Sequence, residues 1–246
     1  MNKPRKSPPS RSPFVAGLTS LATISSRPPG ARTPPLKVLC IGAHPDDPET
    51  ACGGTLLRLK QAGHTLTVVY LTRGEAGVKG KTHQEAAKLR TKEAKAACRI
   101  LQARPVFFGQ VDAAAVFDDS AVRKMQRLFA AEKPDIVFTH WPVDLHPDHP
   151  VTSMLTLQAW ARSPARPALY FYEACIGQQT RVFSPTDYVD ITEVQELKTR
   201  AVYCHRSQFT AANYAASNHP LMESFRGAEC GVAAAEAFIR FPQNPA

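Results

Sequence analysis

Two short polar clusters, about a hundred residues apart, carry the side chains best suited to chemistry. Residues 44–47 read His-Pro-Asp-Asp, and residues 146–149 read His-Pro-Asp-His. A catalytic zinc site typically holds its metal with three nitrogen or oxygen ligands and keeps a fourth position open for water. His44, Asp47 and His149 supply such a set. The sequence therefore predicts a mononuclear metal site built from both clusters.

The other polar members of the clusters could carry out hydrolysis beside that metal. A metal lowers the pKa of its bound water toward ~7, and a nearby carboxylate can take the water's proton during attack on a carbonyl. Asp46 is placed for that role. The resulting oxyanion needs a donor, which a protonated His146 could provide while Asp148 orients or charges its ring. The alternative, solvated carboxylates and helix caps with histidines nearby, leaves unexplained why two clusters follow two strands.

Arg90 is a candidate for contacting the substrate. It falls on the apolar stripe of a helix expected over residues 82–103, where a charged side chain needs a partner or a role. We expect it to clamp substrate hydroxyls or active-site carboxylates. The alternative is a snorkelling side chain, or one paired with Glu85 or Glu93 on its own helix.

A Gly-rich loop over residues 73–81 supplies two weaker candidates. Arg73 and Glu75 could line the pocket beside the clusters, although charges in loops are more often simply solvated. We predict both as substrate-binding residues.

The segments around the clusters alternate between strands and helices. Apolar runs over residues 37–43 and 135–139 predict buried strands. The first run ends directly at the 44–47 cluster, and the second leads to the 146–149 cluster. Such alternation predicts a single α/β domain, a three-layer Rossmann-like sandwich with a mostly parallel central sheet. Ligands in these sheets lie beyond the carboxyl ends of the strands, so the fold can bring the clusters together. Further strands are expected over 65–72, 105–109, 169–174 and 186–191, and helices over 49–63, 82–103, 120–133 and 193–207.

The first 36 residues differ from the rest in composition. They hold eight of the 21 prolines, six basic residues and no acidic one, so most of the net charge of +9 belongs to this leader. An apolar run over residues 14–24 behind basic residues is typical of an export signal, and a Pro/Arg-rich disordered tail is the alternative. We expect the leader to add nothing to the core and residues 37–246 to form the domain. A cytoplasmic location is favoured over export.

The body of the chain excludes several classes of protein. It is near +3, carries no motif of a nucleic-acid-binding fold, and has no apolar run long enough to span a membrane. Its six cysteines form no Cys-x-x-Cys pair and are expected to be small buried hydrophobic residues. A small molecule is therefore the expected partner, and the oligomeric state is left open.

The two clusters together resemble the PIG-L (LmbE-like) family of zinc-dependent de-N-acetylases. The resemblance rests on Gly-Ala-His-Pro-Asp-Asp over residues 42–47 and on His-Pro-Asp-His over 146–149, with supporting similarity over 71–77, 89–94 and 207–209. One departure is Pro48, where the family usually has glutamate; Glu49 is displaced by one position. The resemblance implies that His44, Asp47 and His149 are the zinc ligands and that Asp46 is the general base. It also implies that His146 and Asp148 form the pair that stabilises the oxyanion, and that Arg90 contacts the sugar.

The resemblance also implies an activity, a metal-dependent N-deacetylase acting on a linear amide. Such an enzyme removes the acetyl group from a small N-acetylglucosamine-type sugar conjugate and releases acetate and a free amine. Zn²⁺ is the expected metal, although the same ligands also suit Fe²⁺, Co²⁺ or Mn²⁺. An amidase acting on another acyl group or a thiol conjugate is one alternative. A catalytically silent carbohydrate-binding protein is another, but binding alone has no use for the spare carboxylate of Asp46.

Overall fold

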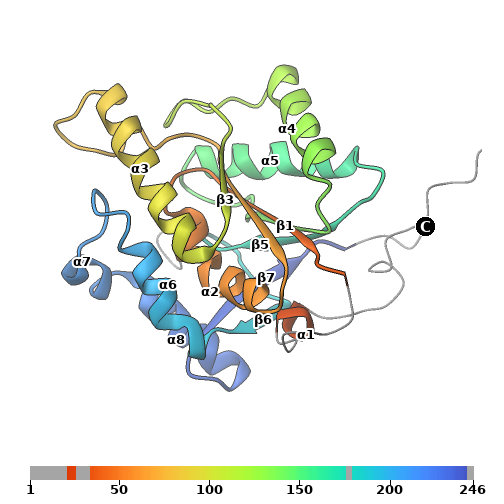
Figure 1. Cartoon of the computed structure of the whole chain (residues 1–246), viewed down its shortest axis with the longest axis vertical. Helices are drawn as coiled ribbons and strands as arrows, with labels where there is room; N and C mark the ends of the chain where they lie inside the picture. Colours follow the sequence, from red (N-terminus) through yellow and green to blue (C-terminus); the bar gives the residue numbers. More distant parts are fainter. Residues whose placement is uncertain (1–20, 26–33, 176–178, 243–246) are drawn as a thin grey trace, which may run out of the picture.

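A seven-stranded sheet organises the part of the chain that the computed structural model describes, residues 21–25, 34–175 and 179–242 (Figure 1). The strands, in chain order, are β1 (Lys37–Gly42), β2 (Thr65–Tyr70), β3 (Arg104–Phe107), β4 (Ile136–His140), β5 (Ala168–Tyr172), β6 (Asp187–Asp190) and β7 (Ala235–Arg240). Their order across the sheet is β3-β2-β1-β4-β5-β7-β6. The first five run parallel, while β7 runs antiparallel to both of its neighbours. The predicted α/β fold with a mostly parallel sheet is confirmed.

The helices form two layers because the side chains of a strand alternate between the two faces of the sheet. On β1, Val38 and Cys40 belong to one hydrophobic cluster, whereas Leu39 and Ile41 belong to the other. The first cluster is completed by α2 (Asp47–Gln61), α3 (His83–Leu101) and α6 (Gln195–Val202), and the second by α4 (Asp119–Glu132) and α5 (Asp148–Ala161). Figure 1 shows the same division, with α4 and α5 on the side of the sheet away from α2 and α6.

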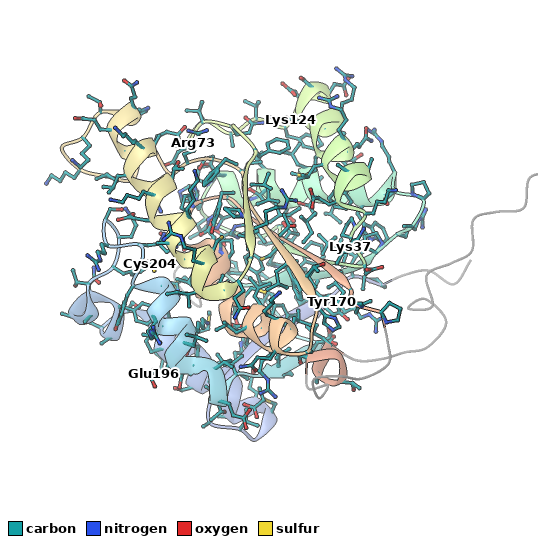
Figure 2. The ribbon with its side chains drawn as sticks, viewed as in Figure 1. Lys37, Arg73, Lys124, Tyr170, Glu196 and Cys204 are labelled. Atoms are coloured by element: carbon teal, nitrogen blue, oxygen red, sulfur yellow. The ribbon has the colours of Figure 1, made fainter. Side chains whose placement is uncertain are left out.

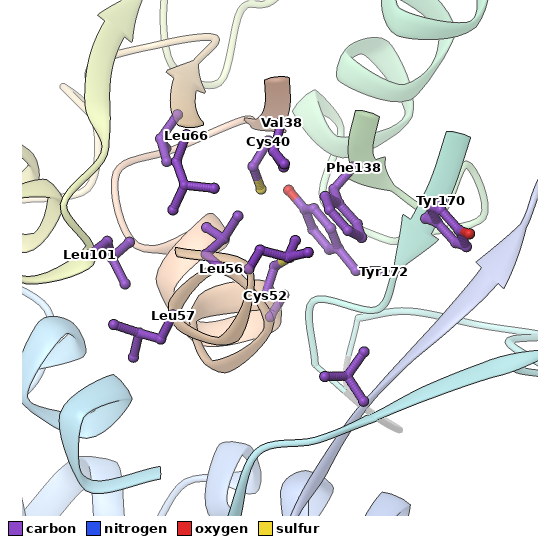
Figure 3. Packing of buried hydrophobic residues seen from close by; sticks show 14 of the residues in the cluster. Val38, Cys40, Cys52, Leu56, Leu57, Leu66, Leu101, Phe138, Tyr170 and Tyr172 are labelled. Carbon is purple, nitrogen blue, oxygen red and sulfur yellow. The ribbon is translucent and has the colours of Figure 1, made fainter. Parts of the chain in front are cut away.

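Leucine, aromatic and small side chains fill the first cluster (Figure 3). The ring of Phe138 stacks on that of Tyr170, with centroids 5.5 Å apart. Tyr172 is fully buried, and its hydroxyl donates to the backbone oxygen of Ile41 at 2.9 Å, which satisfies its polar end within the core. Cys40 and Cys52 pack beside these rings as small hydrophobic residues, as predicted. Cys98 and Cys175 are also buried, whereas Cys204 and Cys230 are not.

The C-terminal part of the chain departs most from the predicted elements. The expected helix over residues 193–207 begins with a single 3₁₀ turn, η1 (Thr192–Val194), and its α-helical part α6 ends at Val202. Two more helices, α7 (Ala211–Ala215) and α8 (Asn218–Cys230), and the reversed strand β7 follow it. None of these three was predicted, and neither was α5. Among the described residues no helix is long and apolar enough to cross a membrane.

The short helix α1 (Leu21–Ser25) is the one described part of the leader before residue 34. It packs against β6 and α2, and Leu21 is fully buried in the first hydrophobic cluster. At this point the leader contributes to the core, contrary to expectation. The expected export signal and disordered tail otherwise lie outside the described residues.

The order of the strands explains where ligands should bind. From β1 the chain adds β2 and β3 on one side, and β4 then pairs with the other side of β1. The crevice beyond the carboxyl ends of β1 and β4 is therefore the switch point of the sheet, where open α/β folds bind their ligands. Both polar clusters lie there.

Candidate active site

Each cluster sits between a central strand and the first turn of a helix. Residues 44–47 join β1 to α2, which begins at Asp47, and residues 146–149 lead into α5, which begins at Asp148. Asp46 has φ of 120°, a strained value for a residue with a side chain, and such strain is commonly found at functional sites. Gly42 has no room for a side chain, because a Cβ there would lie 2.6 Å from Cδ of Pro48. The turn is thus fixed by close packing.

The three predicted ligands converge on one buried oxygen. Oδ2 of Asp47 lies 3.2 Å from Nδ1 of His44 and 3.6 Å from Nε2 of His149. Two ligands of a tetrahedral zinc ion at ~2.0–2.1 Å from the metal are about 3.3 Å apart, so both separations from Asp47 are compatible with a shared ion. Among the described residues, the sets whose ligand atoms lie close enough together to hold a metal include His44 and His149 with His146, and Asp47 and His149 with His140. Burial alone would raise the pKa of Asp47, but the neighbouring histidines outweigh it and hold the pKa well below its usual value. The donor set therefore fits a divalent cation.

A third imidazole, which sequence reasoning missed, faces the same oxygen. His140, the last residue of β4, is fully buried with Nε2 3.2 Å from Oδ2 of Asp47, and its ring stacks on His149 at 3.9 Å. Burial, followed by the effect of His149, lowers the pKa of His140 to about 4. Its position directly after a buried strand was the available signal, because the predicted strand stopped one residue short of it.

Two carboxylates contact the Nε2 atom of His44. This atom lies 3.1 Å from Oδ2 of Asp148 and 3.0 Å from Oδ1 of Asp112, a residue that sequence reasoning also missed. A carboxylate on one ring nitrogen fixes the tautomer and leaves the other nitrogen free for a metal. Nδ1, which lies 3.2 Å from Oδ2 of Asp47, is the nitrogen that would face the metal. Asp148 was predicted to orient His146, but its carboxylate instead contacts His44 and accepts the backbone N–H of Ala113.

His146 lies at the edge of the cluster, with its ring 4.5 Å from that of His44. Its Nδ1 accepts the backbone N–H of Asp148 at 3.4 Å, which leaves the ring proton on Nε2. Burial, together with His44 and His149, lowers the pKa of His146. A neutral ring with Nε2–H can still donate a hydrogen bond, so the donor role does not require the protonated form that the sequence suggested.

Asp46 is held by Arg90. Nη2 of Arg90 donates to Oδ2 of Asp46 at 2.8 Å and also to the backbone oxygen of Pro45, and Nη1 donates to the oxygen of Gly74. Burial raises the pKa of Asp46 to about 6, against the opposing pull of Arg90. Arg90 is buried on the predicted apolar stripe of α3 and clamps an active-site carboxylate, which was one of its two expected functional roles.

The intrahelical alternative for Arg90 is excluded by the partners of the two glutamates. The carboxylate of Glu85 caps the helix at Thr82. The carboxylate of Glu93 accepts the backbone N–H and the hydroxyl of Ser207. Neither glutamate pairs with Arg90.

Glu49 occupies the space beneath the first cluster. It is fully buried, accepts the hydroxyl proton of Tyr70 at 2.5 Å, and lies 3.4 Å from Nε2 of His205. Pro48 lies in the first turn of α2, where a missing N–H costs no hydrogen bond. The carboxylate that is absent at position 48 is therefore present one residue later, facing the interior of the fold.

A cavity of about 240 Å³ opens onto these groups. Its walls include residues from the C-terminal part of the chain that were not predicted as site residues, Gln179, Gln208, Phe209 and His219. Gln208 and Phe209 fall within the supporting similarity over residues 207–209. Arg73 and Glu75 do not line the cavity. Arg73 lies over the ring of Phe107 at 5.5 Å, beside α3 in Figure 2, and its backbone N–H is accepted by Glu75. The loop folds inward on its glycines instead, with Gly77 in the cavity wall.

Gly74 gives a direct test of the clamp. It has φ of +65°, and a Cβ there would lie 2.1 Å from Nη1 of Arg90. We expect Gly74→Ala to displace the guanidinium from Asp46 and to lower catalytic efficiency by about 10-fold or more, because small misplacements near a reacting group are costly. Gly80→Ala is the matched control: its φ is +79°, but its added Cβ meets nothing within 4 Å. If both variants lost catalytic efficiency equally, backbone strain alone would explain the effect.

Comparisons with known proteins match the region that carries both clusters. A family model described as PIG-L, GlcNAc-PI de-N-acetylase, matches residues 39–160. The diacetylchitobiose deacetylase of Thermococcus kodakarensis is 30% identical over 189 residues, which cover 70% of this chain and 70% of that protein. The structure of N,N'-diacetylchitobiose deacetylase from Pyrococcus horikoshii in complex with its inhibitor superposes with a TM-score of 0.75 at 26% identity, covering 84% of each chain.

The similar proteins do not all share one activity. The 4-oxalmesaconate hydratase of Pseudomonas putida is 27% identical over 195 residues, which cover 72% of this chain and 75% of that protein. A hydratase and a deacetylase both add the elements of water to a substrate. The reaction of this chain has to be argued from its own site.

Proposed function

This chain belongs to the PIG-L family, and from that premise we propose that it is a zinc-dependent deacetylase of N-acetylglucosamine-type sugar conjugates. The observation that carries the proposal is Asp46, a carboxylate held by Arg90 next to three convergent ligands and facing the cavity. A ligand set alone would serve binding. A spare, immobilised carboxylate beside it serves proton transfer.

The residues divide the reaction between them. His44, Asp47 and His149 would hold the metal, which when bound polarises water and the amide carbonyl. Asp46 takes one proton of the attacking water and passes it to the leaving nitrogen as the C–N bond breaks, so that the amine departs uncharged. The second proton of that water is lost to solvent when the acid product ionises to acetate. His146 donates its Nε2–H to the carbonyl oxygen as negative charge develops there. Asp112 and Asp148 keep the ring of His44 in place throughout.

The size of the cavity bears on the substrate. At about 240 Å³ it lies below the ~300–1,000 Å³ of pockets that enclose drug-sized ligands. One sugar ring with its acetamido group would occupy it, and the remainder of a conjugate would extend outside. We therefore propose that the enzyme acts on a terminal N-acetylated sugar, with Gln179 and Gln208 offering amide groups to its hydroxyls.

Removing the metal tests the proposal. We expect release of acetate and free amine from N,N'-diacetylchitobiose to stop after exhaustive chelation and to return when Zn²⁺ is added, with one metal bound per chain by elemental analysis. The released acid separates the main alternatives, since an amidase for another acyl group would yield a different acid. Turnover of 4-oxalmesaconate with no acetate from any N-acetylated sugar would instead identify a hydratase. Undiminished deacetylation by metal-free protein would contradict the proposed site.

A further inference from the structure

Asp144 is an acidic residue beside the metal cluster to which neither the motif nor the proposed reaction assigns a role. Its carboxylate is 1% exposed, and its Oδ1 lies 3.0 Å from Nδ1 of His149. That is hydrogen-bond length, although the ring N–H does not yet point straight at the oxygen. The other ring nitrogen of His149, Nε2, lies 3.6 Å from Oδ2 of Asp47.

The position of the Asp144 side chain is fixed from several directions. Oδ1 also accepts the backbone N–H of His146 at 2.9 Å, and Oδ2 accepts the hydroxyl proton of Thr180 at 2.9 Å. Residues 143–145 pair with residues 179–181 through two backbone hydrogen bonds, with Asp144 opposite Thr180. The carboxylate therefore has little freedom to leave the histidine.

The arrangement matches a general requirement of metal-binding histidines. A histidine that binds a metal through one ring nitrogen usually donates the N–H of the other to a carboxylate or carbonyl, which fixes the tautomer and makes the ring a better ligand. Asp148 and Asp112 meet this requirement for His44. Asp144 is the carboxylate placed at hydrogen-bond distance to meet it for His149.

We propose that Asp144 is a positioning residue of the metal centre, which holds His149 with its proton on Nδ1 and its Nε2 directed at the metal. The inference rests on the metal site of the proposed function. It does not place Asp144 in contact with the substrate or the reacting atoms.

A purely structural role is the competing explanation, because Asp144 also closes a local turn through His146 and braces a second segment through Thr180. Turn closure requires only one neutral acceptor oxygen, which asparagine also offers. The brace can be removed by Thr180→Val, which deletes the hydroxyl while leaving the contact between Asp144 and His149. The same change removes the acceptor of the backbone N–H of Ala174, so its effect is an upper limit for the brace. The three effects are therefore separable by substitution.

The test measures the zinc dissociation constant of the purified full chain by competition with a chelating dye. We expect Asp144→Ala to weaken zinc binding by about 10–100-fold, the usual effect of losing such a partner. Asp144→Asn should give a smaller loss, because its oxygen still accepts the ring N–H but carries no charge. Thr180→Val should stay close to wild type. The visible spectrum of the Co²⁺-loaded protein should change in Asp144→Ala and not in Thr180→Val, because only the former frees a ligand.

The possible failures are distinguishable. Unchanged zinc affinity and Co²⁺ spectrum in Asp144→Ala would overturn the inference while leaving the deacetylase proposal intact. Equal weakening in Thr180→Val would show that the brace, not the histidine contact, matters. If the alanine variant does not fold, judged by thermal melting of the metal-free protein, wild-type affinity in Asp144→Asn at unchanged melting temperature would equally overturn it. Absence of zinc binding by the wild-type chain would contradict the proposed function itself.

Discussion

Asp46→Asn should lower deacetylase turnover by ~100-fold or more while the protein keeps its full complement of metal. Asparagine preserves the size of the side chain and is among the residues that best tolerate the positive φ of this position. Its amide oxygen can still accept the hydrogen bond from Arg90, so the clamp remains. What is lost is the ability to take a proton from water. Turnover and zinc content should be measured on the same sample.

The interpretation needs a control for general damage. Asp119→Asn removes a carboxylate whose side chain is 90% exposed, and both turnover and metal content should be unchanged. Turnover near the wild-type rate in Asp46→Asn would remove Asp46 from the role of base. A parallel loss of metal would instead indicate that Asp46 is a ligand.

Lys198→Met should destabilise the fold by about 3–5 kcal/mol, because it leaves buried carboxylates without a counter-charge. Lys198 is fully buried, with Nζ 2.8 Å from Glu223 and 2.7 Å from Glu236. Burial alone would lower the pKa of Lys198, but the two carboxylates outweigh it and raise the pKa. Glu236 also accepts the backbone N–H groups of Gly54 and Thr55, so the charges tie α6, α8 and β7 to α2. The loss is measured by denaturant unfolding.

The pH dependence of this loss separates buried charge from lost packing. Without the lysine the two carboxylates repel each other, and acid relieves this repulsion, so the difference from wild type should shrink as pH falls and grow as it rises. A packing defect would give a difference that does not vary with pH. Lys95→Met, on the exposed face of α3, should change stability by no more than ~0.5 kcal/mol. A similar loss in that control would contradict the argument.

The predictions that held concern residues whose local pattern and place in the fold agree. Apolar runs that end at polar residues predicted β1 and β4, and the rule that ligands gather beyond the carboxyl ends of parallel strands brought the two clusters together. Arg90 was recognised because a charge on an apolar stripe needs a partner. In each case the decisive information lies within a single strand, helix or adjoining loop.

The residues that sequence reasoning missed act through contacts between distant segments. Asp112 meets His44, and Asp144 is placed by its contact with Thr180 as well as by His149. No periodicity or spacing in the sequence indicates that a carboxylate contacts the imidazole of a distant histidine. Strand β7 escaped prediction for a related reason: its Glu236 reads as a polar residue, although it is 3% exposed and paired with Lys198. Tertiary pairing decides such positions.

The proposed metal ligands lie at the starts of helices on opposite faces of the sheet, and this has a mechanical consequence. His44 and Asp47 stand at the start of α2 in one helical layer, and His149 stands in the first turn of α5 in the other. An ion bound by all three would clip the two layers together over the rim of the sheet. Metal binding would then raise the thermal stability of the protein, and the gain would grow with the logarithm of the free metal concentration. The melting temperature of the whole chain should therefore report the metal occupancy of the site.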